Sequence, residues 1–424
     1  MILHRTIISA VALLVSSYGF SQEIADSIGE TDSIPVRWED TIGQRLAAIT
    51  EDVDRSSYYA GISIYDLTSD SLLFAYNQHK MMRPASTEKV LTAITALDLL
   101  GAAHEYTTSI YIDGTIDTDS LGVTALNGNL YVVGDFDPMI ETAHLKQISQ
   151  LIYNKGIRRI NGNLIADVSM KDTLALGNGW CWDDEQPYLT PLSLSGHNYE
   201  STPERINRYS PTRYFLQQLA VCLNADSISV AGTGILPMHF SDNTQLIGTL
   251  VHRIDEVLPR MMKNSDNLYA ESMFYQIGAI AGKNVSWKDC ASRVSATIAK
   301  TGASADYAEI VDGSGLSLYD YVTPSVEVAM LRYAYNNEKI FGPLYHSLPI
   351  AGVDGTLTNR MRSTSAANNV HAKTGSVTGV SSLAGYLTTP NGHLVAFSII
   401  CNSLKKSAEG RSLQDRICIT LTEK

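Results

Sequence analysis

A serine and a lysine three residues apart, Ser86 and Lys89, are the pair in this chain that points most directly to chemistry. An apolar run at 90–100 follows them, with Pro84 before the pair and Gly101 after the run. This pattern predicts one helix, buried on nearly every side, with both side chains on one face of its first turn. Burial and the positive helix end both lower the basicity of a lysine. We therefore expect Lys89 to activate Ser86 as a nucleophile.

The tripeptide Ser-Asp-Asn, a second candidate for chemistry, occurs twice. Ser241-Asp242-Asn243 follows a loop-like stretch, and a turn or a helix cap explains it. Ser265-Asp266-Asn267 stands between two predicted helices, where a short link holds a hydroxyl and an amide rigidly inside a cleft. We therefore select Ser265 and Asn267 as catalytic candidates, and we expect Asp266 to be a structural carboxylate that faces away.

The tripeptide Lys-Thr-Gly also occurs twice. Lys300-Thr301-Gly302 ends a predicted helix, and a lysine in the last turn with glycine beyond it is typical of a C-terminal cap. Lys373-Thr374-Gly375 begins a strand region, where alternate side chains and a backbone N–H can face a cleft. We select Lys373, Thr374 and Gly375, together with Ser376 just after them.

Predicted strands near both ends of the chain, the later pair joined by Pro390-Asn391-Gly392, indicate one antiparallel sheet with helices around it. The fold class is thus α/β of the α+β kind. We predict a catalytic domain at 46–103 and 246–424, interrupted by an inserted domain at 104–245. The predicted strands are 59–67, 72–76, 107–112, 129–133, 162–166, 227–234, 381–388 and 393–401. The predicted helices are 42–53, 143–154, 211–223, 246–263, 267–281, 287–300 and 407–421.

Taken in order, the three motifs are the trio associated with penicillin-interacting serine enzymes. Three longer segments, at 262–271, 312–324 and 351–361, extend the likeness. The chain resembles the D-Ala-D-Ala carboxypeptidase/endopeptidase family, also called class C low-molecular-mass penicillin-binding proteins. The resemblance implies a penicillin-binding/serine β-lactamase-like transpeptidase fold. It also implies that peptidoglycan stem peptides are the substrates and that β-lactams are covalent inhibitors.

The resemblance further implies a role for each catalytic candidate. Neutral Lys89 takes the proton of Ser86, whose Oγ attacks the carbonyl between two D-alanines. Ser265 relays the proton to the leaving amine, and Asn267 orients Lys89 and the substrate amide. The backbone N–H groups of Ser86 and Ser376 hold the oxyanion.

For substrate binding, the resemblance implies that Lys373 and Thr374 bind the terminal carboxylate, with Gly375 beside them. It also implies that penicillins acylate the same serine and that the resulting acyl-enzyme is hydrolysed slowly. Asp312, Ser314 and Asp354 have glycine neighbours, so we expect them in tight turns that support the cleft.

Two features depart from the family pattern. Gly134-Asp135-Phe136-Asp137-Pro138 stands where the family has Gly-Gly-Asp-Pro. The interval between the first two motifs is also short, so we infer that a nested subdomain is reduced or absent. Any partner contact or substrate restriction that this subdomain supplies is then in question, whereas the active-site chemistry is not.

The first residues suggest a targeting segment. A basic start, an apolar stretch at 6–15 and small residues around Gly19-Phe20-Ser21 predict a signal peptide at 1–21, with an uncleaved anchor as the alternative. A flexible lead is expected at 22–45. No later run reaches eighteen apolar residues, so we expect an exported protein, in the periplasm, that is soluble or peripheral after cleavage.

Composition narrows the possible functions. The formal net charge of −12 argues against binding to a nucleic-acid backbone. The five cysteines show no C-x-x-C spacing and the ten histidines no H-E-x-x-H, so we expect no metal and no cofactor, and mostly buried thiols. Two alternatives stay open. One is a serine β-lactamase, although the surroundings of Glu309 do not fit the class A deacylating glutamate; the other is a catalytically idle envelope-binding protein.

Overall fold

The computed structural model describes residues 38–181, 187–195 and 210–424. The predicted signal peptide at 1–21 and residues 22–37 of the predicted lead lie outside the described residues. So does much of the interval in which we inferred a reduced subdomain. Helix α1 spans Trp38–Asp54 and begins before the predicted start at Ile42. The expectation of a flexible lead up to residue 45 is therefore wrong for residues 38–45, because Ile42 already packs into the core.

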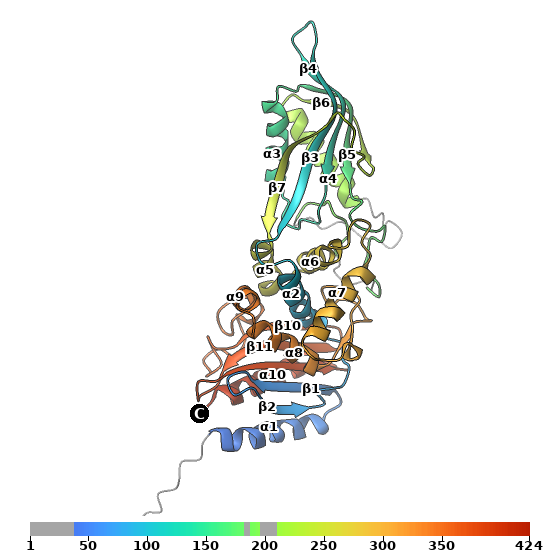
Figure 1. Cartoon of the computed structure of the whole chain (residues 1–424). Helices are drawn as coiled ribbons and strands as arrows, with labels where there is room; N and C mark the ends of the chain where they lie inside the picture. Colours follow the sequence, from blue (N-terminus) through green and yellow to red (C-terminus); the bar gives the residue numbers. More distant parts are fainter. Residues whose placement is uncertain (1–37, 182–186, 196–209) are drawn as a thin grey trace, which may run out of the picture.

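A five-stranded antiparallel sheet joins the two ends of the chain, in the order β10-β11-β12-β1-β2. This arrangement confirms the sheet predicted from the terminal strands. Helices α1 and α10 pack on one face of it, and α8 crosses the other face (Figure 1). The bounds are β1 Tyr59–Asp66, β2 Ser71–Tyr76, β10 His371–Val377, β11 Val380–Thr388, β12 Leu394–Asn402, α8 Pro324–Tyr335 and α10 Ser407–Thr422.

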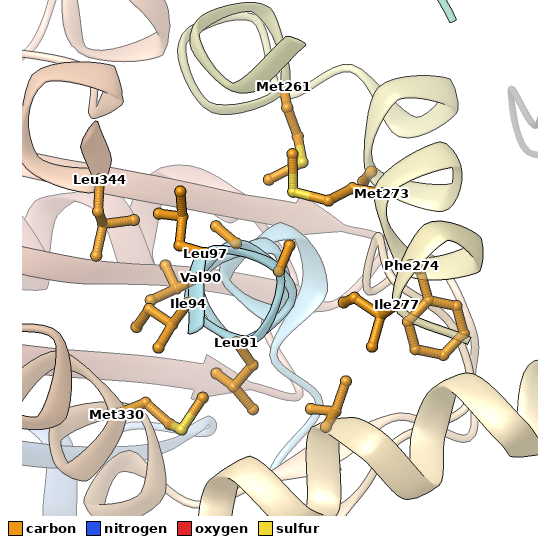
Figure 2. Close-up of a cluster of buried hydrophobic side chains, with 14 of the residues drawn as sticks. Val90, Leu91, Ile94, Leu97, Met261, Met273, Phe274, Ile277, Met330 and Leu344 are labelled. Carbon is orange, nitrogen blue, oxygen red and sulfur yellow. The ribbon is translucent and has the colours of Figure 1, made fainter. Parts of the chain in front are cut away.

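Helix α2, Glu88–Leu99, is the centre of a helical layer above this sheet, and every residue from Glu88 to Leu97 is buried. Figure 2 shows its apolar side chains meeting Met261, Met273 and Met330 from three surrounding helices. The prediction of a helix buried on all sides is confirmed. The neighbouring helices are α5 Ile254–Lys263, α6 Asn267–Ala279, α7 Trp287–Lys300 and α9 Glu338–Ser347, and a two-stranded ribbon pairs β8 Ala308–Glu309 with β9 Tyr321–Val322.

A second five-stranded sheet lies at the far end of the elongated molecule, in the order β6-β5-β4-β3-β7 (Figure 1). Strands β4, β5 and β6 run parallel, whereas β3 pairs antiparallel with β4 and β7. Helices α3 and α4 share one apolar core with this sheet. The bounds are β3 Glu105–Thr118, β4 Thr124–Val133, β5 Arg159–Asp167, β6 Ser229–Ile235, β7 Thr244–Arg253, α3 Thr142–Asn154 and α4 Ser210–Ala225.

One predicted helix was partly wrong. Residues 246–253 form most of β7, and the helix α5 begins only at Ile254. Pairing with β3 along its length fixes this segment as a strand, and its β-branched residues favour that state. The second sheet therefore extends to Arg253, past the predicted boundary at residue 245. The division into domains stays a prediction.

The unusual Gly-Asp-Phe-Asp-Pro segment joins the second sheet to α6. The Phe136 ring stacks on Tyr275 with centroids 5.1 Å apart. Gln276 donates to the carbonyl oxygen of Asp135 at 2.5 Å, and the Asp135 carboxylate accepts from the backbone N–H of Thr107 at 2.8 Å. These contacts tie the second sheet to the helix that carries Asn267.

The five cysteines form no disulfide, and Cys290, Cys401 and Cys418 are buried thiols, as expected. Among the helices of the described residues, none has the length and apolar character needed to cross a membrane.

Candidate active site

A tight turn of 3₁₀ helix, Ala85–Thr87, leads into α2 and places Ser86 half-buried at the helix entrance. The ammonium group of Lys89 donates to Ser86 Oγ at 2.9 Å, to Asn267 Oδ1 at 2.8 Å and to the carbonyl oxygen of Ser314 at 2.8 Å. These three acceptors match the three protons of an ammonium group. The lysine is thus held in one orientation, with its nitrogen against the serine hydroxyl.

The Lys89 side chain is fully buried. Burial lowers the pKa of Lys89 to about 8, even though the carboxylates of Asp312 and Glu271 act in the opposite direction. With that pKa, about a tenth of the lysine is neutral at pH 7. The group can therefore accept a proton from Ser86 near neutral pH.

The second motif lies in the link between α5 and α6. Ser265 adopts a left-handed backbone conformation with φ 59°, and Asn267 is the first residue of α6. Asp266 caps the same helix by accepting from the backbone N–H groups of Leu268 and Tyr269, so it is the structural carboxylate that we expected. The cap orients α6 so that Asn267 reaches Lys89.

The third motif lies on β10. Lys373 is fully buried and donates to Ser265 Oγ at 2.8 Å and to the carbonyl oxygen of Thr374 at 2.7 Å. Burial, and then the charge of Lys89, lower the pKa of Lys373 well below its usual value. The lysine therefore links the second and third motifs.

Gly375 allows β10 to approach the nucleophile turn. A Cβ on Gly375 would lie 2.7 Å from the carbonyl oxygen of Pro84 and 3.0 Å from the backbone nitrogen of Ser86. A side chain here would push the strand away. The close approach brings the backbone of residues 375–376 beside that of Ser86, which is the arrangement an oxyanion hole requires.

Five buried carboxyl side chains surround the first turns of α2, and sequence reasoning selected none of them as site residues. They come from α2, α6, the loop at 312–320 and α8, and each is at most 1% exposed. The sequence analysis placed only Asp312 near the cleft, in a supporting turn. For the other four, the one signal was Glu88, because an acidic residue directly before Lys89 in a helix predicted to be buried is unusual. The five are Glu88, Glu271, Asp312, Asp320 and Glu327.

Asp312 organises the loop that contacts Lys89. Its carboxylate accepts from the backbone N–H groups of Ser314, Gly315 and Ser317 and from Nε1 of Trp180 at 2.6 Å. Thr92 of α2 donates to the carbonyl oxygen of Gly313 at 2.8 Å. The loop is thereby fixed so that the carbonyl oxygen of Ser314 meets Lys89, which supports the expectation of a cleft-supporting turn.

Glu88 and Asp320 add buried acids beside this loop. Neither oxygen of Glu88, and only one oxygen of Asp320, has a hydrogen-bond partner in the described part of the chain. Burial and the Asp312 carboxylate raise the pKa of both groups well above their usual values. Both groups therefore keep their protons to a higher pH than exposed carboxyls do, which limits the negative charge around Lys89.

The two rejected motif copies lie elsewhere. Ser241 donates to Asp113 in the loop before β7. Lys300 pairs with Asp98 at 2.6 Å, and Gly302 ends α7 with φ 83°, as a C-terminal cap requires. The contacts that join Ser86, Lys89 and Asn267 to one another involve neither copy.

Comparison with known proteins identifies the family. Residues 42–195 and 192–424 match the D-Ala-D-Ala carboxypeptidase 3 (S13) family. The chain belongs to this family. The match to the S13 family covers nearly all of the described residues. The chain is thus a serine-type D-Ala-D-Ala carboxypeptidase of the penicillin-binding class.

Relatives of this S13 protein include a D-alanyl-D-alanine carboxypeptidase from an Actinomadura species, 27% identical over 91% of this chain and 86% of the relative. The D-alanyl-D-alanine carboxypeptidase DacB of Haemophilus influenzae is 27% identical over 80% of this chain and 84% of the relative. The crystal structure of penicillin-binding protein 4 (dacB) from Haemophilus influenzae superposes with a TM-score of 0.78 and 25% identity, covering 88% of this chain and 97% of that chain. The penicillin-binding fold predicted from the motifs is confirmed.

Proposed function

We propose that this chain is an exported carboxypeptidase that removes the terminal D-alanine of peptidoglycan stem peptides through an acyl-enzyme on Ser86. The observation that carries the proposal is the 2.9 Å contact between Lys89 Nζ and Ser86 Oγ, with the lysine fully buried. A serine hydroxyl is a weak nucleophile, and an adjacent base that is neutral near pH 7 activates it.

In the first step, neutral Lys89 accepts the Ser86 proton while Oγ bonds to the carbonyl carbon between the two D-alanines. Negative charge develops on the carbonyl oxygen, where the backbone N–H groups of Ser86 and Ser376 stabilise it. Each such donor is typically worth about 3 kcal/mol. The close packing of Gly375 on the Ser86 turn supports this role.

In the second step the C–N bond breaks, and the departing amine takes the proton that Lys89 accepted from Ser86, which leaves Lys89 neutral. Ser265 is the relay, because its hydroxyl accepts from Lys373 at 2.8 Å while its neighbour Asn267 contacts Lys89. Water then attacks the acyl carbon, with Lys89 again accepting a proton, and Ser86 is regenerated. Thr374 supplies a hydroxyl for the terminal carboxylate, and Lys373 supplies positive charge nearby. A DD-endopeptidase action on cross-links would use the same two steps.

Labelling with a fluorescent penicillin tests the acyl-enzyme. The purified full chain should gain the mass of one penicillin, and peptide mapping should place it on Ser86. Ser86→Ala should lose the adduct and reduce turnover of a D-Ala-D-Ala peptide on the order of 10⁴-fold or more. Circular dichroism of the variant provides the control for folding.

The alternatives predict other outcomes of the same experiment. An acyl-penicillin that is hydrolysed within seconds would favour a serine β-lactamase. Folded wild-type chain without any adduct would favour an idle envelope-binding protein. Export is tested separately by sequencing the N-terminus of material recovered from the periplasm; a start at Gln22 is expected, and retention of residues 1–21 would contradict cleavage.

A further inference from the structure

The loop between α9 and β10 is anchored next to the second motif. Nζ of Lys263, two residues before Ser265, donates to Asp354 Oδ2 at 2.5 Å and to the carbonyl oxygen of Leu348 at 2.9 Å. The other oxygen of Asp354 accepts from the backbone N–H of Ile350 at 2.9 Å. The loop is therefore held at both its beginning and its middle.

Gly355 brings the loop still closer to α5. It has φ 54°, and a Cβ there would lie 2.8 Å from the carbonyl oxygen of Lys263. This contact fixes the position of the next residue, Thr356. Its side chain lies beside Thr374 of the third motif. Thr356 is exposed, so a ligand can reach it.

Two threonine hydroxyls meet at this point. Thr374 Oγ1 donates to Thr356 Oγ1 at 2.7 Å. A hydroxyl has one proton to donate, so Thr374 has used its own. Among the hydrogen bonds of the described residues, none uses the proton of Thr356. The Thr356 hydroxyl can therefore donate to an arriving anion without breaking an existing hydrogen bond.

The cationic groups nearby are less available. Lys373 is fully buried and donates to Ser265 Oγ and to the carbonyl oxygen of Thr374. Lys263 is paired with Asp354. Direct contacts to a carboxylate at the rim of the site therefore fall to the hydroxyls of residues 356 and 374.

We propose that Thr356 is a substrate-binding residue, whose hydroxyl donates to the C-terminal carboxylate of the peptide and so favours substrates with a free carboxyl end. The carboxylate enters between the two threonines, and Thr374 turns its proton from Thr356 to the second carboxylate oxygen. This inference rests on the proposed function, since it concerns the same cleft and the same substrate class.

A pair of peptides tests the inference: an acylated peptide ending in D-Ala-D-Ala with a free carboxylate, and the same peptide with a C-terminal amide. Thr356→Val keeps the branched shape but removes the hydroxyl, whereas Thr356→Ser keeps the hydroxyl. Thr358→Val is the matched control, because that hydroxyl donates to the carbonyl oxygen of Gly355 within its own turn at 2.9 Å.

We expect Thr356→Val to lower kcat/KM for the carboxylate peptide about tenfold, the scale of one lost hydrogen bond to a charged group. Its kcat/KM for the amide peptide should stay within threefold. Thr356→Ser should recover most of the loss, and Thr358→Val should leave the ratio of the two peptides unchanged.

If Thr356→Val lowers kcat/KM equally for both peptides, or for neither, the role of Thr356 is overturned while the carboxypeptidase function stands. A wild-type chain that cleaves neither peptide would instead overturn the proposed function. The two failures are thus distinguishable in one set of assays.

Discussion

Gly315 packs so closely on Ala85 that a Cβ at residue 315 would lie 1.9 Å from the Ala85 carbonyl oxygen. The loop that supplies the carbonyl acceptor of Lys89 is therefore in direct backbone contact with the turn that carries Ser86. Gly315 also has φ 76°, a conformation that favours glycine. The position of the nucleophile depends on this contact.

Gly315→Ala should destabilise the protein by about 3 kcal/mol or more, because it adds both a clash with backbone and strain at a positive φ. Urea unfolding measures the loss, and the rate of penicillin labelling should fall with it. Gly302→Ala is the control, with φ 83° but open space around the new Cβ, and should cost only about 1 kcal/mol. Equal losses in the two variants would contradict the importance of the Ala85 contact.

Acylation should depend on pH through Lys89, whose pKa burial lowers to about 8. Only the neutral lysine accepts a proton, so the second-order rate of penicillin acylation should rise about tenfold per pH unit below that value and level off above it. Stopped-flow measurements from pH 5.5 to 9.5 check this. A profile that stays flat through the whole range, or a Lys89→Ala variant with the wild-type profile, would remove the lysine from the role of base.

Stability should fall as the pH rises through the mildly acidic range, because of Glu327. This group is fully buried, and burial raises its pKa to about 7, against the hydrogen bond from Ser398, which acts in the other direction. Between pH 4.5, the ordinary pKa of this group, and about pH 7, its pKa in the folded state, the folded chain holds one proton more than the unfolded chain. The free energy of unfolding is therefore highest below this window and decreases as the pH rises to about 7. The contribution is on the order of 3 kcal/mol.

Glu327→Gln, which cannot ionise, should flatten this part of the curve of unfolding free energy against pH, measured by urea denaturation at pH 5 and pH 8. Exposed Glu309→Gln should leave the difference between the two pH values unchanged. Other buried acids, such as Glu271, retain part of the slope. An identical slope in wild type and Glu327→Gln would show that Glu327 does not carry the effect.

The rejected motif copies should be dispensable. Ser241→Ala and Lys300→Ala should leave penicillin labelling within about threefold, since neither side chain contacts the site. Their counterparts Ser265→Ala and Lys373→Ala should lose on the order of 100-fold, the scale of a lost polar group at a catalytic centre. A reversal of this order would show that the wrong copy was chosen.

Much of the architecture could be predicted because the local patterns were strong. A helix with apolar residues on every side has to be buried, and α2 is. The hairpin at Pro390-Asn391-Gly392 joins β11 and β12 as its turn residues indicate. The motif choices depended on the same reasoning, since Gly302 caps α7 while Lys373 lies on a strand.

Other features depend on contacts that no local pattern contains. The β7 segment runs directly into α5, so its apolar residues were counted as part of one longer helix, whereas pairing with β3 makes them a strand. The buried acids come from four separate elements and meet only when these pack together. The contact between Thr374 and Thr356 likewise joins a strand to a loop that nothing in the sequence marks as its neighbour.

The place of β12 between β11 and β1 also has a consequence for synthesis of the protein. Strand β1 gains this inner neighbour only after the ribosome has produced residues 394–402, although β1 itself emerges first. The nucleophile turn and β10 therefore come together late, through a long-range pairing that slows folding. A chain that stops before β12 would leave β1 with an open edge, exposed to aggregation.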